Sequence, residues 1–248
     1  EVFGGKEYAV TEYTMSEIIA SVYQCIEKQG YKEGILFIDE INCVSETLAP
    51  TMLQFLQCKT FGTHKIPDGW VIVAAGNPPQ YNKSVREFDI VTLDRVKRIE
   101  VKEDYSVWRN YALKNKVHPS IIAYLDLKTE QFYKIEATAD GYAFVTARGW
   151  EDLSRILWMY EESELEITVE FLFEYLQHEE VARGFLGFYQ LCKRIKEEYG
   201  LMQILEGTIG EEKLEKEILK FKETEFDARV AILTFLSDGI HQKIESYD

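Results

Sequence analysis

Acidic and amide side chains follow two short apolar runs, and these are the residue types best suited to chemistry. Asp39 and Glu40 come directly after residues 35–38, and Asn77 comes shortly after residues 71–75. A carboxylate can hold Mg²⁺ while its neighbour orients a water, and an amide can bind that water or a terminal phosphate. Each feature alone is also typical of a solvated strand end or a turn, but together they predict a phosphate site.

The two apolar runs must position these side chains. Neither run alternates with polar residues, and turn residues precede both, which predicts parallel strands buried on both faces of a sheet. Ligands of open α/β sheets gather beyond the carboxyl ends of the strands. We therefore expect Asp39, Glu40 and Asn77 to meet at one edge of this sheet.

Helical patterns flank the first strand. One covers residues 15–27 with Ser16 as N-cap, and a second covers residues 46–57 with Pro50 near its first turn. Residues 59–70 contain turn signals that predict a hairpin before the second strand. Strand, helix and strand in this order indicate an α/β layer.

After about Val101 the strand signals nearly stop, and the chain is predicted to be helical. Amphipathic patterns cover residues 105–114, 119–128, 150–161, 168–177, 211–226 and 230–244. We expect three parts along the chain: a partial α/β core over residues 1–102, an all-α domain over 103–200 and a helical C-terminal extension over 201–248.

Composition excludes several classes of protein. The 248 residues are 46% apolar, which excludes wholesale disorder, and they carry 28 Lys and Arg against 43 Asp and Glu, a net charge of −15. Residues 151–248 hold 23 of the acids and only 11 of the bases. The negative electrostatic field of this acidic part repels the phosphate backbone of nucleic acids, so we expect no nucleic-acid partner. The one opposing signal is a group of bases in the expected hairpin, Lys59, His64 and Lys65.

Neither a membrane span nor a disulfide or zinc framework is predicted. No apolar stretch reaches the roughly 18 residues that a span needs, and the first residues do not resemble a secretory leader. The four cysteines show neither C-x-x-C spacing nor a nearby histidine pair. A reducing cytoplasm is the expected location.

These motifs resemble those of a known family. Residues 35–42, I-L-F-I-D-E-I-N, resemble the Walker B element of AAA+ ATPases, and residues 74–78, A-A-G-N-P, resemble their sensor 1. Within that superfamily, the sequences of these motifs are most similar to those of the MoxR-like and dynein-related branch. Residues 93–96 resemble its arginine-finger segment, and residues 146–150 resemble the start of its sensor 2. The resemblance covers roughly residues 15–160.

The resemblance implies a partial AAA+ parallel-sheet core followed by an all-α lid, with ATP and Mg²⁺ as cofactors. Asp39 would act on Mg²⁺, Glu40 would polarise the attacking water, and Asn77 would orient it. The implied function is ATP hydrolysis that remodels a protein client, in a homo-oligomeric ring that we expect to be a hexamer.

An arginine of the lid is also implied in nucleotide binding. Arg148 would reach the γ-phosphate. A cation in the first turn of a helix interacts unfavourably with the helix dipole unless an anion compensates it. This position of Arg148 therefore favours an anion nearby. The alternative for Arg148 is a salt bridge to Glu151 or Asp152.

A second implied arginine would act in trans on the nucleotide of a neighbouring subunit. The resemblance favours Arg95, with Arg98 as the alternative, because a guanidinium stabilises charge that builds on the transferred phosphoryl group. Either arginine can instead pair with Glu100 or Glu103. The family usually has an aromatic residue where Val96 stands.

The sequence departs from the family in one large respect, because it contains no phosphate-cradling G-x-x-x-x-G-K-[ST] loop. Its one Gly-Lys pair, Gly5-Lys6, is followed by Glu7 where a hydroxyl is required. The order of the fold would place the loop before Glu1, so we expect this chain to be inactive alone. The alternative is a non-catalytic helical interaction module derived from the same fold.

Overall fold

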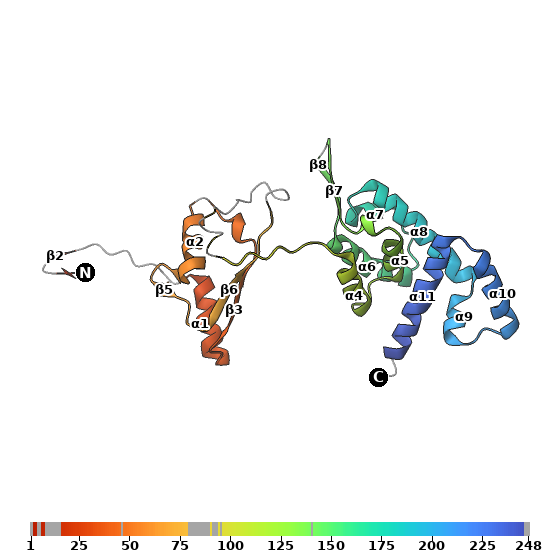
Figure 1. The fold of residues 1–248 in the computed structure, drawn as a ribbon, viewed down its shortest axis with the longest axis horizontal. Coiled ribbons are helices and arrows are strands. Elements are labelled where there is room, and N and C mark those ends of the chain that lie inside the picture. Colours follow the sequence, from red (N-terminus) through yellow and green to blue (C-terminus); the bar gives the residue numbers. More distant parts are fainter. Residues whose placement is uncertain are drawn as a thin grey trace. The chain divides into compact units, whose positions relative to one another are not determined.

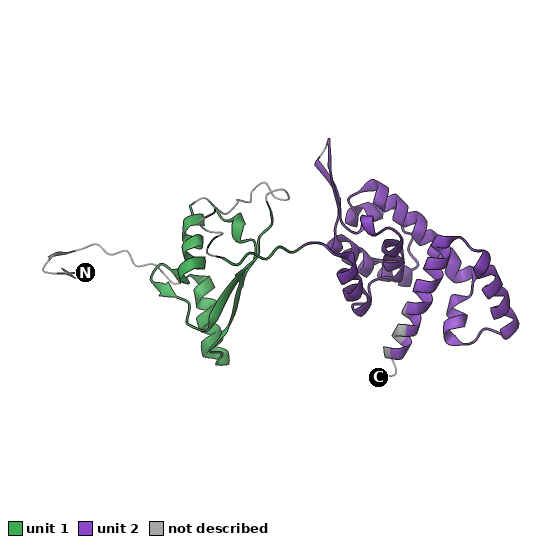
Figure 2. Ribbon diagram, in the orientation of Figure 1, with its two compact units in different colours: residues 1–101 green, residues 102–248 purple. Residues whose placement is uncertain are grey.

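The computed structural model describes residues 2–3, 6–7, 16–45, 47–78, 90, 94, 96–139 and 141–245. The chain divides into two compact units, residues 1–101 and residues 102–248 (Figure 2). It is a mixed α/β structure that is mostly helical, with small sheets and one parallel pair of strands near the N-terminus.

The first unit is built around that parallel pair. β3 (Gly34–Ile38) and β6 (Trp70–Ala74) run side by side from Gly34 opposite Trp70 to Ile38 opposite Ala74, which confirms the predicted parallel strands. The other elements are α1 (Glu17–Gln29), the 3₁₀ turn η1 (Ile41–Cys43), α2 (Ala49–Cys58), the predicted hairpin β4 (Thr60–Phe61) and β5 (His64–Lys65), and a short hairpin β1 (Val2–Phe3) and β2 (Lys6–Glu7).

The prediction that both strands are buried on both faces is wrong. The side chains on one face remain between 41% and 67% exposed: Ile35, Phe37, Val71 and Val73. The alternate side chains, Leu36, Ile38 and Ile72, pack against an apolar cluster supplied largely by α1 and α2. Successive strand residues point to opposite faces. In the described part of the chain these helices therefore cover only one face of the pair.

Local signals fix the ends of the first two helices. The Ser16 hydroxyl accepts a hydrogen bond from the backbone N–H of Ile18 at 3.3 Å, which confirms the predicted N-cap of α1. Gly30 ends α1 with φ at 73°, a conformation that favours glycine. Pro50 lies in the first turn of α2, as predicted, where its missing N–H is tolerated.

The second unit is mainly helical (Figure 1). Its helices are α4 (Tyr105–Lys114), α5 (Pro119–Leu127), η2 (Thr129–Gln131), α6 (Ala147–Glu162), α7 (Val169–Tyr175), α8 (Glu179–Glu198), α9 (Leu201–Glu206), α10 (Glu211–Glu223) and α11 (Phe226–Glu245). Each predicted helix is present, with ends shifted by a few residues. Residues 119–125 of α5 are all buried, and α5 contacts both α8 and α11. The C-terminal helix α11 thus packs into the same core as α5 and α8.

A hairpin interrupts the helical unit, so the prediction that strand signals nearly stop after Val101 is wrong there. β7 (Lys134–Thr138) pairs antiparallel with β8 (Gly141–Val145). The Phe144 N–H donates to the Gln177 carbonyl at 2.8 Å and anchors the hairpin beside the end of α7. Gly141 has φ at 140°, which favours glycine.

Buried polar groups join three helices of this unit. The backbone N–H of His118, before α5, donates to Ser154 Oγ of α6 at 2.8 Å. The Tyr189 hydroxyl of α8 donates to Glu161 Oε1 of α6 at 2.8 Å. Burial opposes ionisation of Glu161, but His118, Lys196 and Tyr189 outweigh it and hold its pKa at about 2. The ionised carboxylate therefore helps to tie α5, α6 and α8 together.

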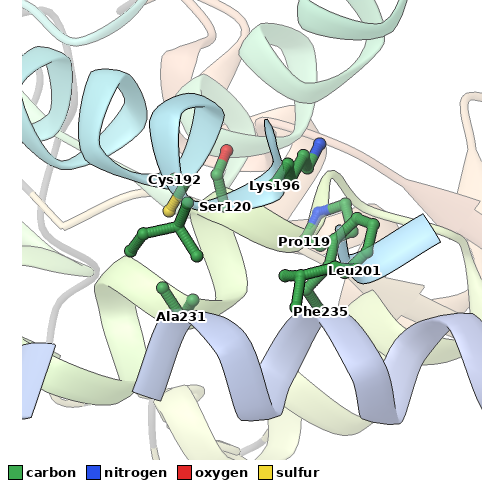
Figure 3. Close-up of a pocket in the computed structure, with 9 residues that line it drawn as sticks. Pro119, Ser120, Cys192, Lys196, Leu201, Ala231 and Phe235 are labelled. Carbon is green, nitrogen blue, oxygen red and sulfur yellow. The ribbon is translucent and has the colours of Figure 1, made fainter. Parts of the chain in front are cut away.

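A cavity of about 10 Å³ lies between α5, α8 and α11 (Figure 3). Cys192 and Lys196 of α8 face Ala231 and Phe235 of α11 across it, and the Lys196 ammonium lies 5.0 Å from the centre of the Phe235 ring. This space holds one water at most. It is a packing defect of the core and not a ligand pocket.

Candidate functional site

The acidic pair and the amide lie at the same edge of the parallel pair. The Ala75 N–H donates to the Ile38 carbonyl at 2.8 Å, and the Ile41 N–H donates to the Ala75 carbonyl at 2.9 Å. Asp39 and Glu40 occupy the turn between these two hydrogen bonds. Asn77 follows Ala75 by two residues. The carboxyl ends of β3 and β6 thus form one rim, which we define as residues 39–42 and 75–77.

The acidic turn has an unusual backbone. Glu40 has φ at 51° and ψ at 38°, a left-handed conformation that costs a non-glycine residue about 1 kcal/mol. The Asp39 carboxylate offsets part of this cost, because its Oδ1 accepts a hydrogen bond from the Glu40 N–H at 2.9 Å. Both side chains are exposed. The turn therefore presents two carboxylates to solvent from a constrained backbone.

A buried asparagine connects the two halves of the rim. Asn42 Nδ2 donates to the main-chain carbonyl of Asn77 at 2.8 Å. Asn42 Oδ1 is also buried and has no hydrogen-bond partner among the described residues. A Cβ atom on Gly76 would collide with this amide and lie 2.8 Å from Asn42 Cγ. The absence of a side chain at Gly76 therefore lets Asn42 hold Asn77 beside the acidic turn.

Sequence reasoning placed Asn42 inside the Walker B resemblance but gave it no role. Two features of the sequence could have indicated this role. An asparagine lies two residues after the acidic pair at the end of the first strand, and a Gly-Asn pair lies at the end of the second strand. Neither feature alone shows that the side chain of the first asparagine reaches the main chain of the second. That contact depends on the register of β3 against β6.

The donors of the rim fit Mg²⁺ held jointly with a phosphate. Asp39 Oδ1 is engaged by the Glu40 N–H, and the exposed carboxylates and the exposed Asn77 amide supply hard oxygen ligands. Mg²⁺ commonly keeps several waters and takes one or two carboxylates together with substrate phosphates. In the described ranges, no group of three or more His, Cys, Asp and Glu side chains is placed to enclose a metal. The rim thus suits a shared cation and not a closed metal cage.

The three predicted arginines lie outside the seven residues that define the rim. Arg95 lies outside the described residues, and Arg98 is exposed in the first unit. Arg148 is exposed in the first turn of α6, which belongs to the second unit. Of the six predicted site residues, the structure brings together Asp39, Glu40 and Asn77.

The alternative salt bridge of Arg148 does not form. Glu151 and Asp152 both pair with Arg155 instead, the latter at 3.0 Å. Within the part of the chain that the structure describes, no ion pair to Arg148 is present. Thr146 caps α6, because its hydroxyl accepts from the Gly149 N–H at 3.3 Å. Arg148 is thus an exposed cation against the helix dipole.

Two lysines of the basic hairpin make contacts within the first unit. Lys59 Nζ donates to the Trp70 carbonyl at 2.6 Å, and Lys65 Nζ pairs with Asp68 at 3.1 Å. Both ammonium groups are already bound within the first unit.

Two further observations concern membrane spans and disulfide bonds. None of the described helices is both long and apolar enough to cross a membrane. None of the four cysteines forms a disulfide bond.

Comparison with protein-family models, with curated proteins and with solved structures gave no match to this chain. The geometry of the rim and the motif resemblance therefore remain the two indications of function.

Proposed function

We propose that this chain belongs to an ATP-hydrolysing remodelling enzyme of the AAA+, MoxR-like type, with Mg²⁺ as its metal and a protein as its client. The observation that supports this proposal is the common rim, where Asp39, Glu40 and Asn77 lie at the carboxyl ends of two parallel strands. An acidic pair and an amide in this position suit phosphoryl transfer to water.

Each rim residue has a distinct role in the proposal. Asp39 holds the metal through its carboxylate. Glu40 accepts the proton of the water that attacks the γ-phosphorus, and Asn77 donates a hydrogen bond that orients this water. The bond to the bridging oxygen breaks, and ADP and phosphate leave. Asn42 acts on Asn77 through its hydrogen bond and is a positioning residue.

The arginines complete the proposal in a hexameric ring. Arg95 or Arg98 reaches the nucleotide of a neighbouring subunit. Arg148, in the helical unit, binds the γ-phosphate of the nucleotide held by its own subunit. Guanidinium groups stabilise charge on the transferred phosphoryl group. Because these 248 residues contain no phosphate-cradling loop, the chain alone should bind ATP weakly or not at all.

Glu40→Gln tests the proposal in the protein as expressed from its own gene. We expect loss of ATP turnover with retained nucleotide affinity, because the amide cannot accept the proton of the water. Glu33→Gln, just before the opposite end of β3, is the matched control and should leave turnover unchanged. Undiminished hydrolysis by Glu40→Gln would refute the role of this carboxylate.

A non-catalytic interaction module is the second candidate. The observation that favours it is the set of half-exposed apolar side chains on α10 and α11 of the helical unit, among them Ile218 and Leu233. The same hydrolysis assay separates the two candidates. A module without catalysis shows no ATP turnover that Glu40→Gln can remove.

A further inference from the structure

The helical unit contains an apolar groove of about 190 Å³ that is distinct from the rim. Its walls are Leu214, Ile218 and Phe221 of α10 and Ile232, Leu233 and Leu236 of α11, and α9 contributes to its floor. These helices lie in the C-terminal part of the unit (Figure 1). The groove opens to solvent and is much larger than the cavity beside Cys192.

The mouth of the groove is lined by exposed apolar groups. Ile218 is 48% exposed and Leu233 is 57% exposed, one on each wall. Two large apolar side chains in this position favour contact with another apolar surface, because such contact releases water from both. Clefts between helices commonly bind the apolar face of an amphipathic helix.

Glu217 gives the groove a charge preference. It is the one charged residue of the groove lining, and its Oε2 is buried without a hydrogen-bond partner among the described residues. A buried carboxylate oxygen without a donor is costly, and an ammonium or guanidinium group would relieve that cost.

The neighbouring lysines of α10 are engaged elsewhere. Lys216 pairs with Glu212 at 2.8 Å, and Lys213 donates to Gln203 at 2.9 Å. Lys220 lies 4.0 Å from the centre of the Tyr199 ring and 3.8 Å from Glu198. Among the described residues, no hydrogen bond or ion pair joins one of these lysines to Glu217, so the carboxylate is open to a cation of a partner.

The surrounding charge also favours a cationic partner. Residues 151–248 carry 23 Asp and Glu against 11 Lys and Arg, so this part of the chain attracts bases over a distance of about 10 Å. A second copy of the chain would bring the same acidic excess and the same Glu217. Charge complementarity therefore argues for a different, basic protein and against self-association.

We propose that the groove between α10 and α11 binds a basic amphipathic helix of a protein partner. Apolar side chains of that helix fill the groove between Ile218 and Leu233, and a Lys or Arg side chain pairs with Glu217. This inference holds whether or not the rim hydrolyses ATP.

The test uses the full chain and a fluorescently labelled model peptide built only of Leu and Lys, with Leu repeated at helical spacing. We expect saturable binding by fluorescence anisotropy, weakened about tenfold by Glu217→Gln. Glu215→Gln is the matched control, because it removes the same charge from an exposed position of the same helix. It should change the affinity by less than about twofold.

A second pair of variants tests the apolar contact. Ile218→Ser should weaken peptide binding, whereas Leu219→Ser, at a 62% exposed position outside the groove, should not. Circular dichroism establishes that each variant retains its helices.

Three results would overturn the proposal. The first is equal binding of a peptide with Glu in place of every Lys. The second is equal weakening by Glu217→Gln and Glu215→Gln, since binding would then reflect net charge alone. The third is a dimer of the free chain in sedimentation that Ile218→Ser dissociates, since a second copy would then occupy the groove.

Discussion

The side-chain amide of Asn42 donates a hydrogen bond to the main-chain carbonyl of Asn77 at 2.8 Å, and so joins the ends of β3 and β6. The two residues are far apart in sequence but lie together because the strands run parallel and in register. This contact fixes the exit of β6 beside the acidic turn, and the exposed carboxylates and amide of the rim depend on it.

Gly76→Ala should break this connection. The added methyl group would collide with the Asn42 amide, so we expect a loss of about 1–2 kcal/mol in the stability of the β3 and β6 pair. Hydrogen exchange of the β3 and β6 amides in the whole chain measures this loss. Gly187→Ala in α8 is the control, since its added Cβ would meet no atom within 4 Å apart from its chain neighbours and the backbone of its own helix. Unchanged exchange in Gly76→Ala would contradict the tight contact.

Glu40→Gly should separate stability from function. Glycine adopts the left-handed backbone at position 40 with less strain, so we expect the first unit to gain about 0.5–1 kcal/mol while the rim loses a carboxylate. Glu27→Gly, at an exposed position of α1, should instead destabilise by about 1 kcal/mol. Amide exchange reports both changes. A destabilised Glu40→Gly would show that the carboxylate contributes more than the strain costs.

The pKa of Glu161 predicts acid sensitivity of the helical unit. Burial opposes ionisation, but His118, Lys196 and Tyr189 lower the pKa to about 2 from an ordinary value of 4.5. The stabilisation is fully present above about pH 4.5, falls as the pH decreases towards 2, and amounts to about 3 kcal/mol at neutral pH.

Urea unfolding of Glu161→Gln measures this contribution. The deficit of the variant relative to the wild type should be largest near pH 7 and should shrink below pH 4.5. Glu162→Gln, at the exposed neighbouring position, is the control and should track the wild type. A deficit that does not change with pH would mean that the charge of Glu161 is not what stabilises the unit.

Cys192 should be the least reactive of the four thiols. Burial between α5, α8 and α11 raises its pKa to about 12, whereas Cys58 is exposed. In native protein at pH 8, mass spectrometry should find iodoacetamide on Cys58 well before Cys192. In urea the two rates should converge. Comparable native rates would indicate that the core around Cys192 opens readily.

Much of the fold follows from local patterns. The apolar runs around Leu36 and Ile72 predicted the parallel strands, and Ser16 and Pro50 located two helix starts. The rim also follows, because strand ends of a parallel pair must share an edge. These features depend on residues that are neighbours in sequence or on a general rule of sheet topology.

The remaining features depend on tertiary contacts. An apolar run such as Val71–Val73 cannot show whether one or both faces are covered, since that depends on the packing of α1 and α2. The β7 and β8 hairpin lies between helical patterns, and the Asp-Gly pair at residues 140–141 is the turn signal that could have located it. The role of Asn42 depends on strand register, which single-sequence reasoning did not supply.

Paramagnetic NMR of the isotope-labelled protein, as expressed from its own gene, tests most directly whether the rim holds a divalent cation with phosphate. Mn²⁺ added with ATP should broaden the amide signals of Asp39, Glu40 and Asn77 selectively. Asp39→Asn should abolish this broadening, and Asp68→Asn, near the opposite end of β6, should not. If the broadening lies elsewhere, or if Asp39→Asn leaves it intact, the rim is not a metal and phosphate site.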